Sequence, residues 1–424
     1  MNTTVRLAAL LYACLTLVML VMLAPLSADG QVRSSDSAPV GIVDADTDSA
    51  RVQTRHDLFF DPDDGQLDLS GFLTTRSGFL PVASIITEPA VGYGGALGLM
   101  FLHDSIENRA QQVRDKSPDG TLTRLPPPSM TGVGAFATES GSWGGALFHN
   151  GIYLDDRLRY LGVAVYSELD LDFFGRGGDF DLPIESVAYS LDGFIFVQQL
   201  LTRVADSDVF MGFNYKYGSF DSELDLGLGT DLPEWLPPLK TNIKIASAGL
   251  LVEYDSRNTT FTPDHGINAR TELQFFEQAL GSDRDFFKAY ANLRGWIPVR
   301  RDVVLGLRAD GNASDGDTPF FMLPSVDLRG ISLSRYQGQF TLTTEAEMRW
   351  DFTRRWSLLG FLGAGWSAAT DLNDFVLSDA HPAGGSGFRY LISRVFGIRT
   401  GMDFAWSEDD FAFYLVTGTA WGRK

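Results

Sequence analysis

From residue 79 to the C-terminus, the chain is divided into short segments in which apolar and polar side chains alternate. In segment 267–275, Ile267 and Phe275 lie on one parity, and Asn268 and Glu272 lie on the other. Segments 209–217 and 287–294 show the same period of two. Because successive side chains of a strand point to opposite faces, this period predicts β-strands rather than helices.

The alternating segments are separated by turn residues and predict sixteen strands. The predicted strands are 79–87, 92–103, 129–139, 142–153, 157–171, 185–200, 206–219, 241–254, 265–278, 284–297, 301–312, 336–351, 355–368, 384–393, 397–406 and 410–421. Most reach the ~9–11 residues that a tilted membrane-spanning strand requires. A soluble sandwich would bury the apolar parity, whereas a membrane barrel turns it toward lipid. The predicted fold is all-β: one closed, sixteen-stranded, antiparallel transmembrane barrel, because closure leaves no sheet edge unpaired.

The N-terminus decides the predicted compartment. Arg6 is followed by an apolar run from Leu7 to Leu23 and by the small residue Ala28. This pattern predicts a secretory signal peptide over residues 1–28. The single cysteine, Cys14, lies within it, so we expect no disulfide and no thiolate metal site in the mature chain.

Residues 29–78 are predicted to be a periplasmic linker or tail, and residues 79–421 the barrel. Aromatic residues recur near the ends of the predicted strands and fit the interfacial girdles of a barrel. These residues are Trp143, Tyr153, Trp296, Trp350, Trp356, Trp366, Trp406 and Trp421. We therefore expect the mature protein in the outer membrane of a Gram-negative bacterium.

Charge and composition exclude several kinds of partner. The formal net charge is -20, which argues against nucleic acid, since phosphate binding needs clustered lysine and arginine. The five histidines are scattered without ligand spacing, so no metal site is predicted. The acidic run from Asp61 to Asp64 precedes Gly65, where a calcium loop would need an acidic residue, and is read as a turn. We find no catalytic constellation and expect neither an enzyme nor a cofactor.

A long connection between the eleventh and twelfth predicted strands contains Asp327-Leu328-Arg329-Gly330. The strand that follows carries Glu345, Glu347 and Arg349 on one parity. A guanidinium inside a barrel is costly without a carboxylate partner. We predict that the loop folds into the lumen and that Arg329 pairs with a lumenal carboxylate there. The alternative is a simple turn with a surface arginine.

Four stretches together resemble the bacterial surface antigen family, the BamA/TamA-type outer-membrane barrels. They are 327–330, like the family's arginine loop tip; 253–266, like its periplasmic turn; 361–365, like its Phe-x-Asp-x-Gly strand; and 414–421, like its terminal assembly strand. The arginine loop and the turn are the more specific pair. The resemblance implies a lumenal loop lock formed by Asp327, Arg329, Gly330 and Glu347. It also implies a periplasmic turn motif of Asp255, Arg257, Asn258, Pro263 and Gly266, and an assembly signal of Tyr414, Gly418 and Trp421.

The same resemblance implies an insertase or translocase barrel that acts in outer-membrane assembly or in moving a protein or lipid. The implied partners are outer-membrane lipids, the barrel-assembly machinery during biogenesis, and a separate periplasmic partner. The sequence departs from the family pattern in three places. Gly363 stands where the family has an aspartate, three residues follow Trp421, and too few residues precede the first strand for a POTRA module. A passive diffusion channel is the alternative function, and a structural or adhesive barrel is a third.

Overall fold

The computed structural model describes residues 58–75, 78–86, 92–103, 129–173, 187–225, 240–332, 335–369, 375–408 and 411–423. The predicted signal peptide, residues 1–28, and the first part of the predicted tail, residues 29–57, lie outside the described residues. None of the helices in the described ranges has the length and apolar character needed to cross a membrane.

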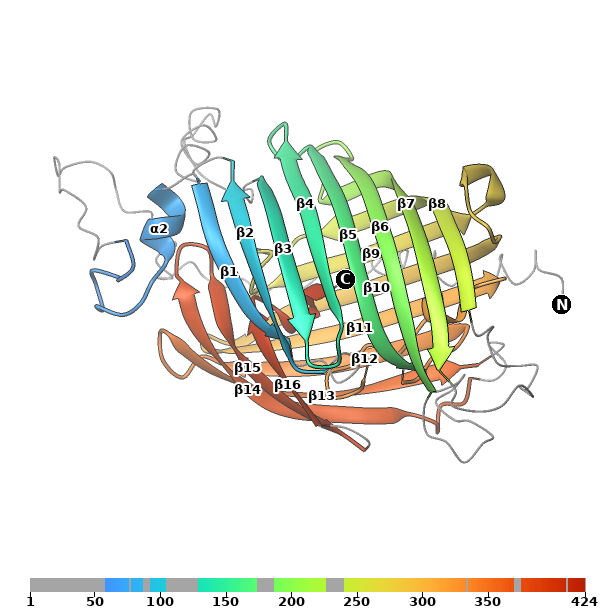
Figure 1. Cartoon of the computed structure of the whole chain (residues 1–424). Coiled ribbons are helices and arrows are strands. Elements are labelled where there is room, and N and C mark those ends of the chain that lie inside the picture. Colours follow the sequence, from blue (N-terminus) through green and yellow to red (C-terminus); the bar gives the residue numbers. More distant parts are fainter. Residues whose placement is uncertain are drawn as a thin grey trace.

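Sixteen antiparallel strands form one sheet in which every strand pairs with its neighbours in sequence, as Figure 1 shows. The strands are β1 (Gly78–Ile86), β2 (Gly94–Leu102), β3 (Met130–Thr138), β4 (Trp143–Tyr153), β5 (Leu158–Phe173), β6 (Val187–Arg203), β7 (Val209–Asp225), β8 (Lys240–Asp255), β9 (Gly266–Phe276), β10 (Phe286–Arg300), β11 (Val303–Gly316), β12 (Phe340–Trp350), β13 (Trp356–Ala368), β14 (His381–Ser393), β15 (Ile398–Ser407) and β16 (Phe411–Thr417). The helical elements are α2 (Ser70–Thr75), η1 (Gln278–Leu280), η2 (Phe320–Met322) and η4 (Ala420–Arg423). The predicted all-β, sixteen-stranded antiparallel fold is confirmed.

The two faces of the sheet are inverted relative to a soluble sandwich. In β9, Ile267 and Phe275 are exposed on the outside, whereas Asn268, Glu272 and Gln274 are buried on the inside. This is the arrangement that the alternating pattern predicted, with the polar parity facing the lumen. Large apolar side chains are likewise exposed on the outer face of other strands. They include Leu97, Leu147, Phe213, Leu250, Leu307 and Leu362.

The first and last strands lie beside each other and bring the sheet round into a barrel (Figure 1). We call the boundary between β1 and β16 the seam. No backbone pairing crosses the seam within the described residues, although β1 pairs with β2 and β16 pairs with β15. The ring of Tyr93, just before β2, stacks on Phe413 of β16 at a centroid distance of 5.9 Å. The barrel is therefore closed in shape but is not closed by a complete ladder of hydrogen bonds.

The two ends of the barrel differ. We call the end where β1 begins and β16 stops the N-terminal end, and the opposite end the loop end. The connection between β11 and β12 starts at the loop end and carries the predicted arginine motif. Because the strands are antiparallel and consecutive, the connection between β8 and β9 lies at the N-terminal end.

Residues 58–75, which we call the strap, lie within the predicted linker or tail and are docked on the barrel. The guanidinium of Arg355, in the turn between β12 and β13, donates to Asp61 at 2.5 Å and to Asp68 at 2.6 Å. The backbone N–H of Leu69 donates to the carbonyl of Ile392 at 2.7 Å. The local pattern could not reveal this docking, because the partners of the acidic run lie far along the chain.

Two of the predicted girdle aromatics are also in the wrong place. Trp143 and Trp350 are exposed on the outer face, as a girdle requires, but Trp296 and Trp421 are buried among lumenal residues. The last strand, predicted as 410–421, stops at Thr417. A positive φ of 82° at Gly418 turns the chain away from the strand, and η4 then places Trp421 inside the barrel.

Candidate functional site

The connection between β11 and β12, residues 317–339, folds into the lumen, and we call it the arginine loop. Val326 and Leu328 are buried. The backbone N–H of Val326 donates to Tyr336 at 3.0 Å, and that of Gly338 donates to Pro324 at 3.0 Å. The apolar residues of the loop therefore pack inside the barrel, and its backbone is satisfied by a local hairpin.

Arg329, at the tip of the hairpin, is only 5% exposed and contacts two strands on opposite sides of its guanidinium. Its Nε donates to Oε1 of Glu345 on β12 at 2.7 Å, and its Nη1 donates to Oδ2 of Asp403 on β15 at 2.7 Å. The ring of Phe361 on β13 lies under the guanidinium, 3.6 Å from its central carbon. The cation is thus held by two buried carboxylates and one aromatic face.

Gly330 allows this tip to approach the last strands closely. Its φ is 91°, a left-handed conformation that favours glycine, and a Cβ there would lie 3.1 Å from the backbone N of Trp406. Its N–H donates to the hydroxyl of Tyr414 on β16 at 3.1 Å. The loop tip is therefore attached to β16 as well as to β12 and β15.

The structure brings Arg329 and the predicted partner Glu347 together, but Glu347 is not the main partner. Oε2 of Glu347 lies 2.7 Å from Nη2 of Arg329 without the alignment of a hydrogen bond. Glu345 lies deeper, accepts hydrogen bonds from Arg329 and accepts one from the indole of Trp421 at 3.0 Å. Glu347 therefore contributes mainly charge, whereas Glu345 positions the guanidinium.

Asp327 is joined to the same network through Arg308 on β11. Nη2 of Arg308 lies 3.1 Å from Oδ2 of Asp327 and also donates to Asp310 at 2.5 Å. Nη1 of Arg308 lies 3.4 Å from Oε2 of Glu345. The loop residue and the wall residues thus form one alternating array of buried charges, in which each cation has carboxylate neighbours.

Gly363 was expected to leave the site one carboxylate short, because it stands where the family motif has an aspartate. In this chain Asp403 on β15 supplies a second buried carboxylate, which also accepts from Arg389 at 2.6 and 2.8 Å. A Cβ at position 363 would lie 2.6 Å from the carbonyl oxygen of Thr344 and 2.7 Å from Leu328. The site is therefore built around glycine at 363. Asp403 is the sole acidic residue of the β15 sequence, which was the signal available for finding it.

A second, apolar anchor of the arginine loop was not predicted. Phe320 packs edge-on against Tyr189 of β6, and Phe321 packs against Phe220 of β7, each with a centroid distance of 5.3 Å. The ammonium of Lys288 on β10 donates to the carbonyl of Met322 at 2.6 Å. The loop therefore spans the lumen from the wall formed by β6, β7 and β10 to the wall formed by β12 and β15.

Of the predicted assembly signal, Tyr414 contacts the arginine loop directly and Trp421 reaches it through Glu345, whereas Gly418 contacts β15. The indole of Trp421 packs 5.6 Å from that of Trp296 and donates to Glu345. The N–H of Gly418 donates to the carbonyl of Arg399 at 2.7 Å. Tyr414 and Trp421 are buried and face the lumen, so they do not form an exposed terminal edge of the folded barrel.

The predicted turn motif between β8 and β9 is a compact hydrogen-bonded unit. Asp255 is fully buried and accepts from Nε of Arg257 at 2.8 Å. The side-chain oxygen of Asn258 accepts from the N–H of Asp264 at 3.1 Å, and Gly266 has a φ of 108°. These residue types are needed to close the turn, so their local role is structural.

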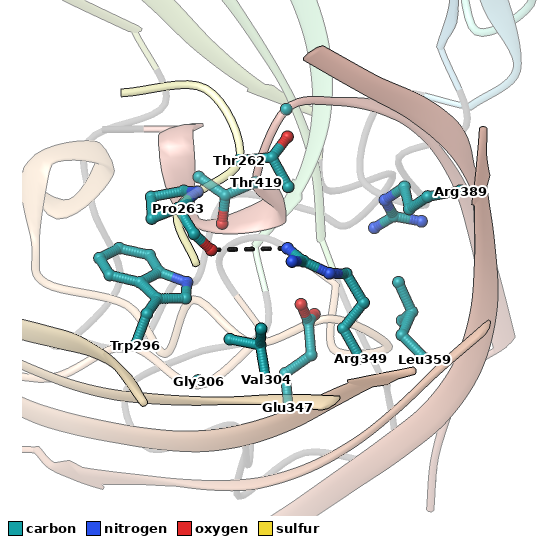
Figure 2. A pocket seen from close by; sticks show the side chains of 11 residues that line it. Thr262, Pro263, Trp296, Val304, Gly306, Glu347, Arg349, Leu359, Arg389 and Thr419 are labelled. Atoms are coloured by element: carbon teal, nitrogen blue, oxygen red, sulfur yellow. Dashed lines mark hydrogen bonds between the residues drawn. The ribbon is translucent and has the colours of Figure 1, made fainter. Parts of the chain in front are cut away.

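The same turn reaches across the N-terminal end of the barrel to β12. Nη1 of Arg349 donates to the carbonyl of Pro263 at 3.4 Å, and Arg349 also pairs with Asp264. Figure 2 shows Arg349 beside Glu347 in a cavity lined by residues of the turn and by Thr419, which follows β16. The turn motif and the loop lock thus share one polar cavity in the lumen.

The geometry of this site forms a lock on the arginine loop. Its arginines are already paired with carboxylates, and the described residues contain no group of three or more histidine, cysteine, aspartate or glutamate side chains arranged to hold a metal ion. What the arrangement can do is hold a loop across the lumen and couple it to the last strand through Tyr414 and Trp421.

Comparisons with known proteins give the site a context. Residues 211–323 match the Omp85 superfamily domain. No curated protein sequence matches the chain. Similar solved structures include BamA from Haemophilus ducreyi lacking POTRA domains 1–3, with 12% identity and a TM-score of 0.53 over 81% of this chain and 70% of that one. CdiB from Escherichia coli has 11% identity and a TM-score of 0.52 over 80% of this chain and 61% of that one.

At these identities the two structures support the fold alone, and the sequence match supports the family. The matched range includes β8, β9 and the turn motif between them, and it ends just before the arginine motif. The predicted resemblance is thereby confirmed over residues 211–323, which match the Omp85 superfamily domain.

Proposed function

We propose that this protein is an outer-membrane barrel of the insertase or translocase type, which acts on a protein or lipid at its seam rather than by passing solutes through its lumen. The family match supports the outer-membrane location. The exposed apolar band of the outer wall fits the same location. We infer that the N-terminal end of the barrel faces the periplasm, because the turn between β8 and β9, which resembles a periplasmic turn, lies at that end.

The observation that carries the proposal is the combination of an occupied lumen and a seam that has no β-ladder in the described residues. The arginine loop is anchored at two opposite walls, so it obstructs a path through the barrel. The seam is the one neighbouring pair of strands without backbone pairing in the described residues. An unpaired strand edge can accept another strand, which gives the seam a chemistry that the rest of the wall lacks.

The passive-channel alternative predicts a different lumen. A diffusion channel keeps a water-filled passage, with charged side chains at a constriction. Here the charged side chains of the lumen bind a loop of the same chain, and the apolar anchor fills the opposite wall. These contacts support a plugged barrel.

Site-specific photo-cross-linking in native membranes tests the proposal. A photoreactive residue at Leu415, which is exposed on β16, should form adducts with a polypeptide or lipid client. The matched control is Met211, which is exposed on β7, far from the seam. If Leu415 and Met211 give the same adducts, the seam has no special role and the proposal fails. A large, steady single-channel conductance of the wild-type protein would favour the diffusion channel instead.

A further inference from the structure

The strap lies at the N-terminal end of the barrel, close to the seam. β1 pairs with β2 along one edge, and no ladder joins its other edge to β16 within the described residues. An edge of this kind separates locally at low free-energy cost unless another contact holds it. A contact of the strap beside the seam can therefore hold this edge in place.

The first contact of the strap is electrostatic. Arg355 is almost fully buried, and so are Asp61 and Asp68, to which it donates. Asp64 is bound in a bidentate manner, with distances of 2.7 Å from Nε and 3.1 Å from Nη2. Arg394, in the turn between β14 and β15, lies 3.0 Å from Asp61. Three carboxylates of the strap thus converge on one guanidinium of the barrel.

The second contact is a set of backbone and hydroxyl hydrogen bonds next to the first. The N–H of Leu69 donates to the carbonyl of Ile392, and the hydroxyls of Ser70 and Ser393 lie 3.1 Å apart. The N–H of Val395 donates to the hydroxyl of Ser70 at 3.1 Å. The hydroxyl of Tyr390 donates to the carbonyl of Leu67 at 2.8 Å. These bonds give the strap a defined register on β14 and on the turn that follows.

All of these barrel residues lie on the β16 side of the seam, whereas the chain leaving the strap enters β1. Figure 1 shows α2 between the start of β1 and the ends of β14 and β15. From Thr75 to Gly78 there are three peptide steps, which span at most about 11 Å when fully extended. The start of β1 is therefore tethered to the strands on the other side of the seam.

We propose that the strap is a clasp that holds the seam together at the N-terminal end, so that β1 and β16 can separate only from the loop end. The clasp acts at a boundary where the described residues form no β-ladder. Its strength depends on Arg355 and its carboxylates, and its reach depends on the short link between α2 and β1. The clasp would hold the seam whether or not the barrel acts on a protein or lipid.

Severing the link in the folded protein tests the clasp directly. A recognition site for a sequence-specific protease replaces residues of the link between Thr75 and Gly78 and its flanks without a change in length, and the mature chain is refolded into lipid nanodiscs. Spin labels at His103 and Thr417 report the N-terminal end of the seam, and labels at Ser140 and Glu408 report the loop end. All four residues have exposed side chains. Distance distributions are measured by pulsed electron resonance before and after cleavage.

Cleavage should broaden the distance distribution for the labels at 103 and 417 and leave that for the labels at 140 and 408 unchanged. A control protein carries the same protease site in the turn at Ser140–Gly141, is labelled at 103 and 417, and should show no broadening after cleavage. If cleavage after Thr75 leaves the distribution at the N-terminal end unchanged, the strap does not hold the seam and the inference is overturned.

A second measurement tests what holds the strap. The variant S70C/S393C should form a disulfide readily when oxidised glutathione is added as the two-electron oxidant, because the two serine hydroxyls already lie 3.1 Å apart. Adding Arg355→Ala should slow disulfide formation by about tenfold, as expected when charge-assisted hydrogen bonds are lost. Arg354→Ala, which removes the same charge from the exposed neighbouring residue, should leave the rate unchanged. Equal rates in the Arg355 and Arg354 variants would show that the carboxylate cluster does not dock the strap.

Discussion

Nη1 of Arg329 lies 2.7 Å from Oδ2 of Asp403, which joins the tip of the arginine loop to the last but one strand of the barrel. On its other side the same guanidinium donates to Glu345 of β12. The loop lock therefore connects the strands that precede the seam to a strand nearer the middle of the sheet. Gly330 also contacts Tyr414 of β16, and Trp421, which follows β16, contacts Glu345. Displacement of β16 would therefore disturb the loop tip as well.

The first prediction ranks the carboxylates of the lock. Glu345→Gln and Asp403→Asn should each lower the stability of the barrel more than Glu347→Gln, because their side chains are fully buried and hydrogen-bonded to Arg329. Removing one member of a buried ion pair costs about 3–5 kcal/mol. The measurement is the unfolding transition of the purified barrel, followed by its heat-modifiable migration on gels.

A double-mutant cycle tests whether Arg329 interacts directly with each of these carboxylates. Arg329→Ala combined with Asp403→Asn should be less destabilising than the sum of the single changes, with a coupling of about 0.5–3 kcal/mol. The same cycle with Glu347→Gln should give a smaller coupling. Strict additivity of the Arg329 and Asp403 effects would mean that the two side chains are not partners.

The second prediction concerns conductance. Arg329→Ala alone should leave the barrel poorly conducting, because Phe320 and Phe321 keep the loop against the wall formed by β6 and β7. Adding Phe320→Ala and Phe321→Ala should release the second anchor, and deleting residues 317–338 should give the largest conductance. Planar-bilayer recordings measure these steps. A fully open pore in the single Arg329→Ala variant would show that the apolar anchor contributes nothing.

The third prediction concerns Gly363. Gly363→Asp should destabilise the barrel rather than tighten the lock, because a Cβ there would lie 2.6 Å from the carbonyl oxygen of Thr344. Overpacking of this kind costs typically about 1–3 kcal/mol. The matched control is Gly360→Ala, since the nearest atom to a Cβ at position 360 is 3.9 Å away. A Gly363→Asp barrel that unfolds at a higher temperature than the wild type would contradict the packing argument.

Much of the barrel could be predicted because strand alternation is a local property. Each of the sixteen predicted ranges corresponds to one observed strand, and the buried parity of β12 is the one that carries Glu345, Glu347 and Arg349. The loop's entry into the lumen was likewise predictable, because a guanidinium among apolar residues needs carboxylates. Strand β7 is longer than predicted, because its pairing with β6 continues to Asp225 beyond the segment of clearest alternation.

What could not be predicted depends on contacts between residues that are far apart in sequence. Parity indicates that Asp403 points inward but not that β15 brings it to Arg329. The aromatic character of Trp421 fits a girdle or a lumenal anchor equally well, and only the turn at Gly418 decides between them. In the same way, the acidic run at 61–64 gives no indication that its partner is Arg355.

The last prediction concerns the pH dependence of the strap. Hydrogen bonding to Arg355 holds the pKa of Asp64 below its ordinary value of 3.8, despite the opposing effect of burial. Burial alone would lower the pKa of Arg355, but Asp64 and Asp68 raise it, so the guanidinium remains charged. A carboxylate whose pKa is lower in the docked state stabilises docking above pH 3.8, and this contribution is lost as the pH falls through the lowered pKa.

The docked strap should therefore be equally stable at pH 7 and pH 5 and should loosen only below about pH 4. Amide hydrogen exchange of residues 58–75, corrected for the intrinsic effect of pH, measures the loosening. Asp64→Asn should exchange faster than the wild type at pH 7 and should show a smaller further change on acidification, because the titrating partner of Arg355 has been removed. Arg394, Asp61, Asp63 and Asp68 also lie at this contact, and the variant leaves all four in place. Loosening that begins near pH 6 would contradict the assignment to carboxylates.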